Sequence, residues 1–377
     1  MATNGTNSNE TDYEYYFDIY EKVSIWSAVF LSLVALLTVI ANGISLFAIY
    51  KDPLKCFRNP FAVFITGILV SDFLTGFAVE PAFVASYTLW MVEVDIESYA
   101  KVIRSCQILS AVTINTSFLT VLALAVIQLM ALSCPSCYNR CVTSPLAILG
   151  IIVIWIYAIL FALLPEMSSK VDMELYFTID LILHTTLISV ILVIIYIIIY
   201  FMFKRAMRRH QIATSHGNDG EEDLGEDQRQ NRGDVPVEKI EKDFLIGSFI
   251  VIVVLMATVW PFSISLYIWL FRPYGSDDTF MRDYIALIFS DDILFLKFLL
   301  DPLIFVWRLP KYRKAIRMVL APARVRLTNL FSRGSLPSAS YHRQEGEDSG
   351  EDHLILPDRE WNADITTGVL EIRENEA

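Results

Sequence analysis

The chain has 377 residues, of which 54% are hydrophobic and only 19% are charged, and its mean hydropathy is +0.47. This composition leaves too little polar surface for a soluble domain of this size, and it excludes that class of protein. The formal net charge of −12 does not indicate a basic partner, because much of it lies in two acidic segments, residues 217–234 and 345–364, whose composition predicts disorder.

Seven long apolar stretches predict membrane-spanning helices. A helix needs about 20 residues to cross the hydrocarbon core of a bilayer, and these stretches are too long for barrel strands. They lie near residues 24–50, 60–86, 104–132, 145–165, 176–203, 244–271 and 283–307. The sequence therefore predicts an all-α membrane protein, a seven-transmembrane helix bundle with a short amphipathic cytoplasmic helix after the seventh span.

Basic residues follow the first, fifth and seventh predicted spans. They are Lys51, Lys55, Arg58, Lys204, Arg205, Arg208, Arg209, Arg308, Lys311, Arg313, Lys314 and Arg317. Because cytoplasmic loops carry an excess of lysine and arginine, this distribution predicts an extracellular N-terminus and a cytoplasmic C-terminus. We therefore expect a multi-pass protein of the plasma membrane.

The predicted organisation has three parts. Residues 1–23 form an extracellular tail whose Asn4 and Asn9 lie in N-glycosylation sequons, whereas the sequon at Asn115 lies within a span and is expected to stay unmodified. The seven-helix domain and its membrane-surface helix are predicted at 24–320, with an acidic and disordered third inner loop at about 204–243. An acidic, disordered cytoplasmic tail follows at 321–377.

The five cysteines predict no disulfide bond. They are Cys56, Cys106, Cys134, Cys137 and Cys141. Four lie on the predicted cytoplasmic side, where thiols stay reduced, and Cys106 has no partner on the outer side. The last three are spaced like metal ligands but lack a fourth ligand, so palmitoylation is favoured over metal binding, and neither a metal nor a cofactor is expected.

Polar and aromatic residues occur at characteristic places within the spans: Asn42 in IANGISLFAIY, Asp72 in LVSDFLTG, Trp155 in IIVIWIYA, Trp260-Pro261 in ATVWPF, and Asp301 opening DPLIF. In this order they resemble the motifs of the rhodopsin-like (class A) G-protein-coupled receptors, over about residues 24–320. The resemblance is to a divergent, orphan-type member.

The departures from the family pattern concern activation. The family's D-R-Y motif falls on Ile127-Gln128-Leu129, so its arginine is missing, and Glu241 matches the acidic residue that usually pairs with that arginine. Gln128 and Glu241 are thus the expected G-protein-facing residues, without an ionic lock between them. Trp260 directly precedes Pro261, whereas the family places one residue between them, so the ring should point about 100° away from its usual place.

The resemblance implies an internal polar network of Asn42, Asp72, Ser117 and Asp301, which in the family holds water and sodium. Lys297 lies four residues before Asp301, so both share one helical face. We expect the ammonium of Lys297 to replace the sodium ion between Asp72 and Asp301, with one excess negative charge that allows a proton to bind. The alternative is a lysine that snorkels toward a membrane surface.

A lysine in the seventh span also raises an opsin alternative, with retinal held as a Schiff base. The opsin lysine position matches Phe295 here, and Lys297 lies two residues later, facing another direction. Retinal binding is therefore not expected.

A ligand pocket is predicted in the outer half of the bundle. Its candidate residues are Glu80, Ser110, His184, Trp260 and Asp291. The acids could recognise a cationic group, because intramembrane charges are functional candidates by default. Ser110 replaces the aspartate of the amine receptors, which argues against a monoamine. The alternative is that these acids lie among lipid headgroups or pair with Arg104 or Arg282.

The two tails suggest further partners. Acidic neighbours of Tyr13, Tyr15 and Tyr16 permit sulfation, which would capture basic peptides, although a solvated linker is the alternative. LPKYRKAIRMVLAPARVR reads as a basic helix on the bilayer surface. The serines that follow could be phosphorylated by a receptor kinase and then bind arrestin. They are Ser332, Ser335, Ser338 and Ser340.

No nucleotide-binding glycine loop or catalytic triad occurs, so neither an enzyme nor a nucleic-acid partner is expected. The resemblance implies a receptor that transmits an extracellular ligand signal to heterotrimeric G proteins through helix rearrangement. One alternative is an ion- or proton-coupled transporter of small solutes, although internal repeats are lacking. Another is a ligand-binding seven-helix protein with weak or no G-protein coupling.

Overall fold

The computed structural model describes residues 7–55, 57–89, 96–168, 171–217, 237–273, 277–309 and 312–322. Within these ranges the chain forms helices and short connections, with no strand. The prediction of an all-α protein is therefore confirmed.

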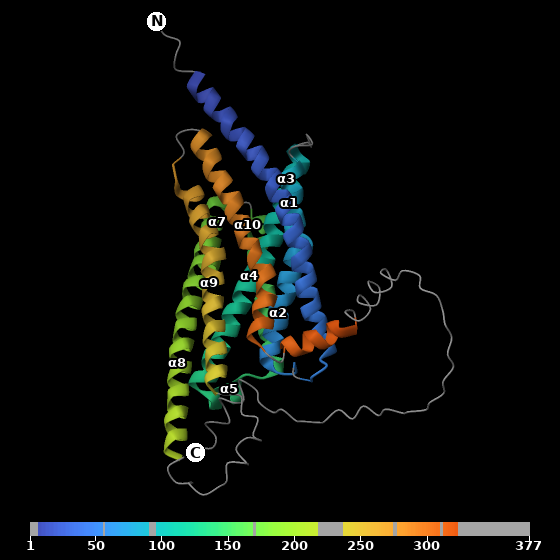
Figure 1. The fold of residues 1–377 in the computed structure, drawn as a ribbon. Helices are drawn as coiled ribbons and strands as arrows, with labels where there is room; N and C mark the ends of the chain where they lie inside the picture. Colours follow the sequence, from blue (N-terminus) through green and yellow to red (C-terminus); the bar gives the residue numbers. More distant parts are fainter. Residues whose placement is uncertain are drawn as a thin grey trace, which may run out of the picture. The chain divides into compact units, whose positions relative to one another are not determined.

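The helices follow one another along the chain (Figure 1). In the first half they are α1 (Asn7–Lys51), α2 (Pro60–Leu74), η1 (Thr75–Val79), α3 (Glu80–Leu89), α4 (Ile96–Ser133) and α5 (Pro135–Cys141). In the second half they are α6 (Ser144–Met167), α7 (Met173–Asp180), η3 (Leu181–Leu187), α8 (Ile188–Gly217), α9 (Val237–Phe271) and α10 (Asp277–Arg308).

Six helical segments in the described part of the chain are long and apolar enough to cross a bilayer. They are Tyr15–Lys51, Pro60–Leu89, Glu97–Ser133, Ser144–Met167, Met173–Arg205 and Val253–Phe271. The protein is thus a multi-pass helical membrane protein. The helix α10 has 32 residues, and its charged residues include Asp291, Asp292, Lys297 and Asp301.

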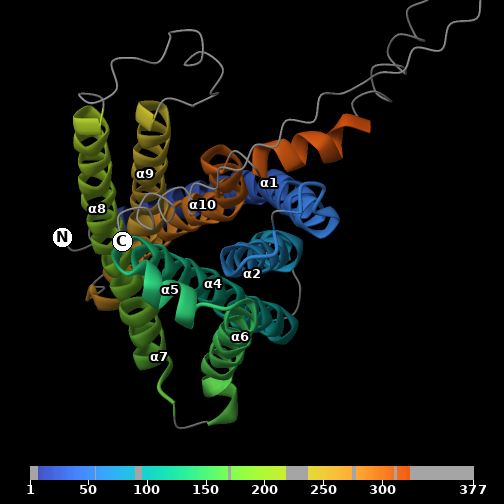
Figure 2. The same ribbon diagram turned by 90° about the horizontal axis from the view of Figure 1, so that it is seen from below.

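The helix α4 lies at the centre of the packing, since it contacts α2, α3, α6 and α8, while α10 packs against α9 and α1 (Figures 1 and 2). Three clusters of buried apolar side chains fill the spaces between helices. One joins α4, α8 and α9. A second joins α1, α3 and α10, and a third joins α2 and α4 with Tyr312.

Two of the long helices contain a π-helical segment, η1 and η3, where the turn is wider than in an α-helix. At η1 the chain comes very close to α1. A Cβ atom added to Gly76 would lie 2.7 Å from Cγ2 of Thr38 and 3.2 Å from the backbone nitrogen of Val39. Only glycine allows this approach without displacing one of the helices.

The helix ends differ from the predicted boundaries. The first helix begins at Asn7, so the described part of the predicted 1–23 tail is helical, while Asn4 lies outside the described residues. Likewise α8 continues to Gly217 and α9 begins at Val237, so both extend into the predicted third inner loop, and residues 218–236 lie outside the described residues.

A last helical stretch covers residues 312–322, where the sequence predicts an amphipathic helix. Its first residues belong to the same compact unit as the bundle, and the ring of Tyr312 meets that of Phe57 edge to face at 5.3 Å. A second unit begins at Arg317. Residues 323–377, including the predicted phosphorylation sites, lie outside the described residues.

Candidate functional site

Lys297 of α10 is buried in the interior of the bundle, where its ammonium group has hydrogen-bond partners. Its ammonium donates hydrogen bonds to Oδ2 of Asp301 at 2.8 Å and to Oγ of Ser117 at 2.9 Å. Only 2% of the residue is exposed, so the side chain does not reach a membrane surface. The spacing of four residues places Lys297 and Asp301 on one face of α10, as the sequence predicts.

The contacts continue from α10 through α4 to α2. Oγ of Ser117 donates to Oδ1 of Asp72 at 2.7 Å, and both residues are fully buried. The chain Asp72–Ser117–Lys297–Asp301, here called the lysine network, thus joins three helices. The sequence predicts the ammonium between both carboxylates; in the structure it bonds Asp301 directly and reaches Asp72 through the serine hydroxyl.

Asn42 of α1 has a separate role beside this network. Pro302 has no N–H group, so the carbonyl of Phe298 loses its normal helical donor. The amide of Asn42 donates to that carbonyl at 3.0 Å and to the carbonyl of Thr38 at 2.9 Å. Asn42 therefore satisfies a buried backbone acceptor that the proline leaves open and ties α1 to α10 next to Lys297.

Aromatic rings complete the surroundings of the ammonium. Nζ of Lys297 lies 5.1 Å from the ring centroid of Phe118 and 4.6 Å from that of Phe298. Both distances fit cation–π contacts. Sequence reasoning missed these rings, because each directly follows a network residue, and neighbours in sequence do not share a helical face.

The lysine network contains an uneven number of charges. Two carboxyl groups and one ammonium give a formal charge of −1 when all are ionised. Oδ2 of Asp72 and Oδ1 of Asn42 are buried and have no hydrogen-bond partner in the described part of the chain. An open acceptor beside an excess negative charge is a place where a proton or a water molecule can bind.

The five residues predicted to line a ligand pocket lie on five helical elements, α3, α4, η3, α9 and α10. All lie in the described part of the chain, and no hydrogen bond or ion pair joins any two of them. Ser110 donates to a carbonyl of its own helix, Trp260 is 39% exposed, and His184 takes part in a separate set of contacts. A pocket of about 250 Å³ lies between α3 and α4. It is lined by Ala82, Lys101, Val102, Ser105, Cys106 and Leu109.

Two of the predicted acids and a neighbour face other helices. Glu80 is fully buried beside Thr38 of α1, and neither carboxyl oxygen has a hydrogen-bond partner among the described residues. Asp292 accepts a hydrogen bond from Ser27 of α1 at 2.7 Å through Oδ2. Asp291, which precedes it, is half-buried. We call Glu80, Asp291 and Asp292 the acidic set.

The arginines considered as partners of these acids pair elsewhere. Arg104 contacts Glu166, and Arg282 lies 3.6 Å from Asp283. Neither neutralises Glu80 or Asp291. The described part of the chain therefore holds no ion pair between Glu80 or Asp291 and these arginines, and the alternative that the two acids lie among lipid headgroups stays a prediction.

Gln128, which the sequence predicts to face a G protein, lies near the C-terminal end of α4. Its Oε1 is buried and has no hydrogen-bond partner in the described part of the chain. Glu241 lies within α9, but its side chain is outside the described residues.

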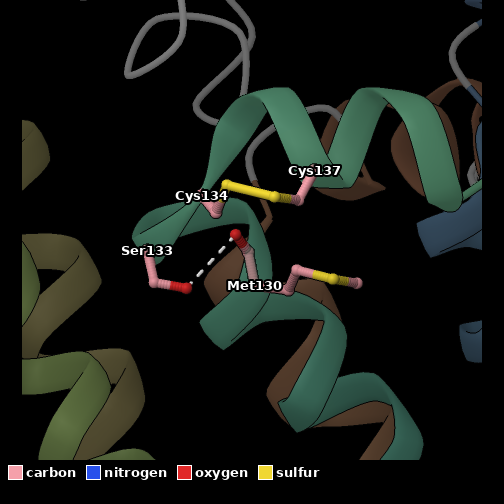
Figure 3. The surroundings of a disulfide bond; sticks show 4 residues. All are labelled: Met130, Ser133, Cys134 and Cys137. Atoms are coloured by element: carbon pink, nitrogen blue, oxygen red, sulfur yellow. Dashed lines mark hydrogen bonds between the residues drawn. A yellow bond between two sulfur atoms is a disulfide. The ribbon is translucent and has the colours of Figure 1, made fainter.

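The expectation of no disulfide is wrong, because Cys134 and Cys137 are bonded (Figure 3). Cys134 lies at the break between α4 and α5, and Pro135 begins the next helix. One turn of α5 then brings the two Cα atoms to 5.3 Å, within the range a disulfide requires. The expectation that cytoplasmic thiols stay reduced did not take this local geometry into account. Cys106 and Cys141 are free thiols.

Comparison of the sequence with models of known protein families gives no match, and comparison with curated proteins gives no significant similarity. The family resemblance therefore rests on the motifs and their order within the helices.

Proposed function

We propose that the chain is a G-protein-coupled receptor of the plasma membrane, which transmits an extracellular ligand signal to heterotrimeric G proteins through helix rearrangement. The observation that carries this proposal is the lysine network, which links α2, α4 and α10 through one buried ammonium. A ligand that moves α10 against α2 has to break and remake these contacts. Such discrete arrangements are what a two-state switch needs.

The proposal takes α10 as the seventh span. Within it, Lys297 and Asp292 are buried, while Phe289, Ile293 and Leu303 are exposed. An apolar outer face suits contact with lipid, and inward charges with partners are how ionisable groups persist within a membrane. The seven segments and the basic residues that follow three of them support an extracellular N-terminus.

Coupling to a G protein is tested in cells that carry G-protein dissociation sensors. The unaltered chain is compared with empty vector and with Gln128→Arg at matched surface levels. We expect a signal from the unaltered chain above background and a larger signal from Gln128→Arg, because the arginine restores the charge that the family places there. The receptor proposal is contradicted if neither the unaltered chain nor Gln128→Arg gives a sensor signal in the presence of a broad panel of cationic small molecules and basic peptides.

A second candidate function is proton-coupled transport of a small solute. It is favoured by the open Oδ2 of Asp72 beside an excess negative charge. Proteoliposomes with an internal pH dye provide the test. Proton influx that Asp72→Asn abolishes supports transport, whereas a protein that keeps the liposomes proton-tight supports the receptor.

A further inference from the structure

The disulfide between Cys134 and Cys137 lies at the junction of α4 and α5, in the connection between two candidate membrane spans (Figure 3). These spans are Glu97–Ser133 and Ser144–Met167. Because irregular backbone exposed to lipid does not occur in the hydrocarbon core, a connection of this kind lies in or near water. A water-soluble molecule can therefore reach the disulfide.

The disulfide bridges a bend in the chain. Cys134 has φ −144° and ψ 79°, which is not a helical conformation, and Pro135 begins α5. A backbone hydrogen bond lies on each side of the bend. The amide of Cys134 donates to the carbonyl of Met130 at 2.9 Å, and the amide of Tyr138 donates to the carbonyl of Cys134 at 3.0 Å. The disulfide adds a cross-link to these two contacts and so restrains α5 against the end of α4.

The two sulfur atoms differ in their access to solution. Cys137 is exposed, whereas Cys134 is half-buried. Exchange between a thiol and a disulfide begins when a thiolate attacks one of the two sulfur atoms, and access helps to decide which one. We therefore expect attack at Sγ of Cys137, with Sγ of Cys134 as the leaving group.

A purely structural disulfide is the alternative. The stabilisation that a disulfide provides grows with the length of the loop that it closes, and these cysteines are only three residues apart in sequence. The three clusters of buried apolar side chains that hold the bundle together include neither cysteine. The bond therefore acts mainly on the local junction, and the bundle does not need it to stay folded.

We propose that Cys134 and Cys137 form a reversible redox site, which a small water-soluble thiol opens by reduction and the corresponding disulfide closes by oxidation. In the proposed orientation the site faces the cytoplasm, whose glutathione supplies such a thiol. Opening the bond removes the cross-link at the bend and loosens α5 from the end of α4. This proposal goes beyond receptor function, and the exchange chemistry does not depend on G-protein coupling.

The opening reaction takes two steps. A thiolate attacks Sγ of Cys137, forms a mixed disulfide with it and releases Cys134 as a thiolate, which takes up a proton. A second thiolate attacks the sulfur of the first small thiol and releases Cys137, which is protonated in turn. The cysteine pair thus gains two electrons and two protons, and two small thiols are oxidised to one disulfide. Closure is the same sequence in reverse.

Reversible exchange is tested on the full chain in lipid nanodiscs, equilibrated with mixtures of reduced and oxidised glutathione. Acid quenching, alkylation of free thiols and mass spectrometry then give the fraction of the Cys134–Cys137 pair that is reduced. We expect nearly complete reduction in an excess of reduced glutathione and nearly complete reoxidation when oxidised glutathione is restored. A pair that stays oxidised or stays reduced in all mixtures overturns the proposal.

The loosening of α5 is tested by amide hydrogen exchange of the oxidised chain, the reduced chain and Cys137→Ser. We expect the amides of α5, including that of Tyr138, to exchange about tenfold faster in the last two, because the cross-link no longer opposes local opening. The matched control is Cys141→Ser, which removes an exposed free thiol of the same helix and should leave exchange in the oxidised chain unchanged. Equal exchange in the oxidised chain, the reduced chain and Cys137→Ser overturns the proposed loosening.

Discussion

The lysine network and the acidic set both hold ionisable groups inside the bundle, but they differ in the partners that surround these groups. In the lysine network, the ammonium of Lys297 has a carboxylate, a hydroxyl and two aromatic rings around it. In the acidic set, Asp292 has one donor, Ser27, and both carboxyl oxygens of Glu80 lack a hydrogen-bond partner in the described part of the chain. The lysine network is arranged around a cation, whereas the acidic set consists of carboxyl groups with few hydrogen-bond partners.

This difference shows what decides the cost of a buried charge. An ionisable group inside a bundle is tolerated when neighbouring side chains neutralise it or form hydrogen bonds with it. Removing one of these neighbours leaves an uncompensated buried charge, which lowers the free energy of unfolding. The lysine network should therefore respond sharply to single substitutions, whereas the acidic set should respond weakly. The following predictions test this contrast, from the largest expected effect to the smallest.

Lys297→Ala should have the largest effect. It leaves Asp301 and the Ser117–Asp72 pair without their cation, and breaking a buried ion pair costs about 3–5 kcal/mol. We expect a strong loss of folded protein at the cell surface and a lower melting temperature after purification. The double variant Lys297→Asn with Asp301→Asn, which removes both charges, should recover part of the loss. Normal folding of Lys297→Ala would show that the network contributes little to stability.

Ser117→Ala and Ser27→Ala compare the single hydroxyl that serves each region. An unsatisfied buried polar group costs about 1–3 kcal/mol. Ser117→Ala leaves open both an oxygen of Asp72 and an N–H of Lys297, while Ser27→Ala leaves open one oxygen of Asp292. The loss of unfolding free energy should therefore be larger for Ser117→Ala. The opposite order in thermal unfolding would contradict the contrast between the regions.

Gly76→Ala tests the close approach of η1 to α1 next to Glu80. The new methyl group would meet Thr38 at 2.7 Å, and forcing extra volume into a packed interior costs about 1–3 kcal/mol. The matched control is Gly43→Ala, whose Cβ would lie 3.5 Å from the ring of Phe73, an ordinary contact. Thermal unfolding should separate the two variants, and equal melting temperatures would disprove the tight contact.

Glu80→Gln should have the smallest effect. The amide keeps the shape of the side chain and removes no ion pair, so the change in unfolding free energy should stay below about 1 kcal/mol. Asp301→Asn provides the comparison, because it deprives Lys297 of its carboxylate and should cost several times more. A loss for Glu80→Gln as large as that for Asp301→Asn would reveal an ionised Glu80 with a charged partner.

The lysine network could be predicted because its residues obey local rules. Lys297 and Asp301 share a helical face by spacing alone, and the order of Asn42, Asp72 and Ser117 in successive apolar stretches matches a known pattern. The hydroxyl of Ser117 between the two charges could not be predicted, because it depends on how α4 is rotated against α2 and α10.

The predicted ligand pocket shows the limit of this reasoning. Glu80 lies beside Thr38 of α1, whereas His184 contacts Tyr157 of α6. The direction in which a side chain points depends on helix rotation, and a π-helical turn alters that rotation for every residue beyond it. The disulfide between Cys134 and Cys137 was missed for a similar reason, since it depends on the break at Pro135.

The sequence by itself determined that the protein is helical and crosses the membrane several times, and it located the six apolar helices that the described part of the chain contains, because hydrophobic length is a property of the local chain. Only the tertiary structure decided which partners the buried polar and charged groups find. Asn42 reaches the carbonyl freed by Pro302, Ser117 joins Lys297 to Asp72, and Tyr157 reaches His184 because different helices pack with particular faces together. Those faces are selected by the fit of many side chains at once, which no single stretch of sequence contains.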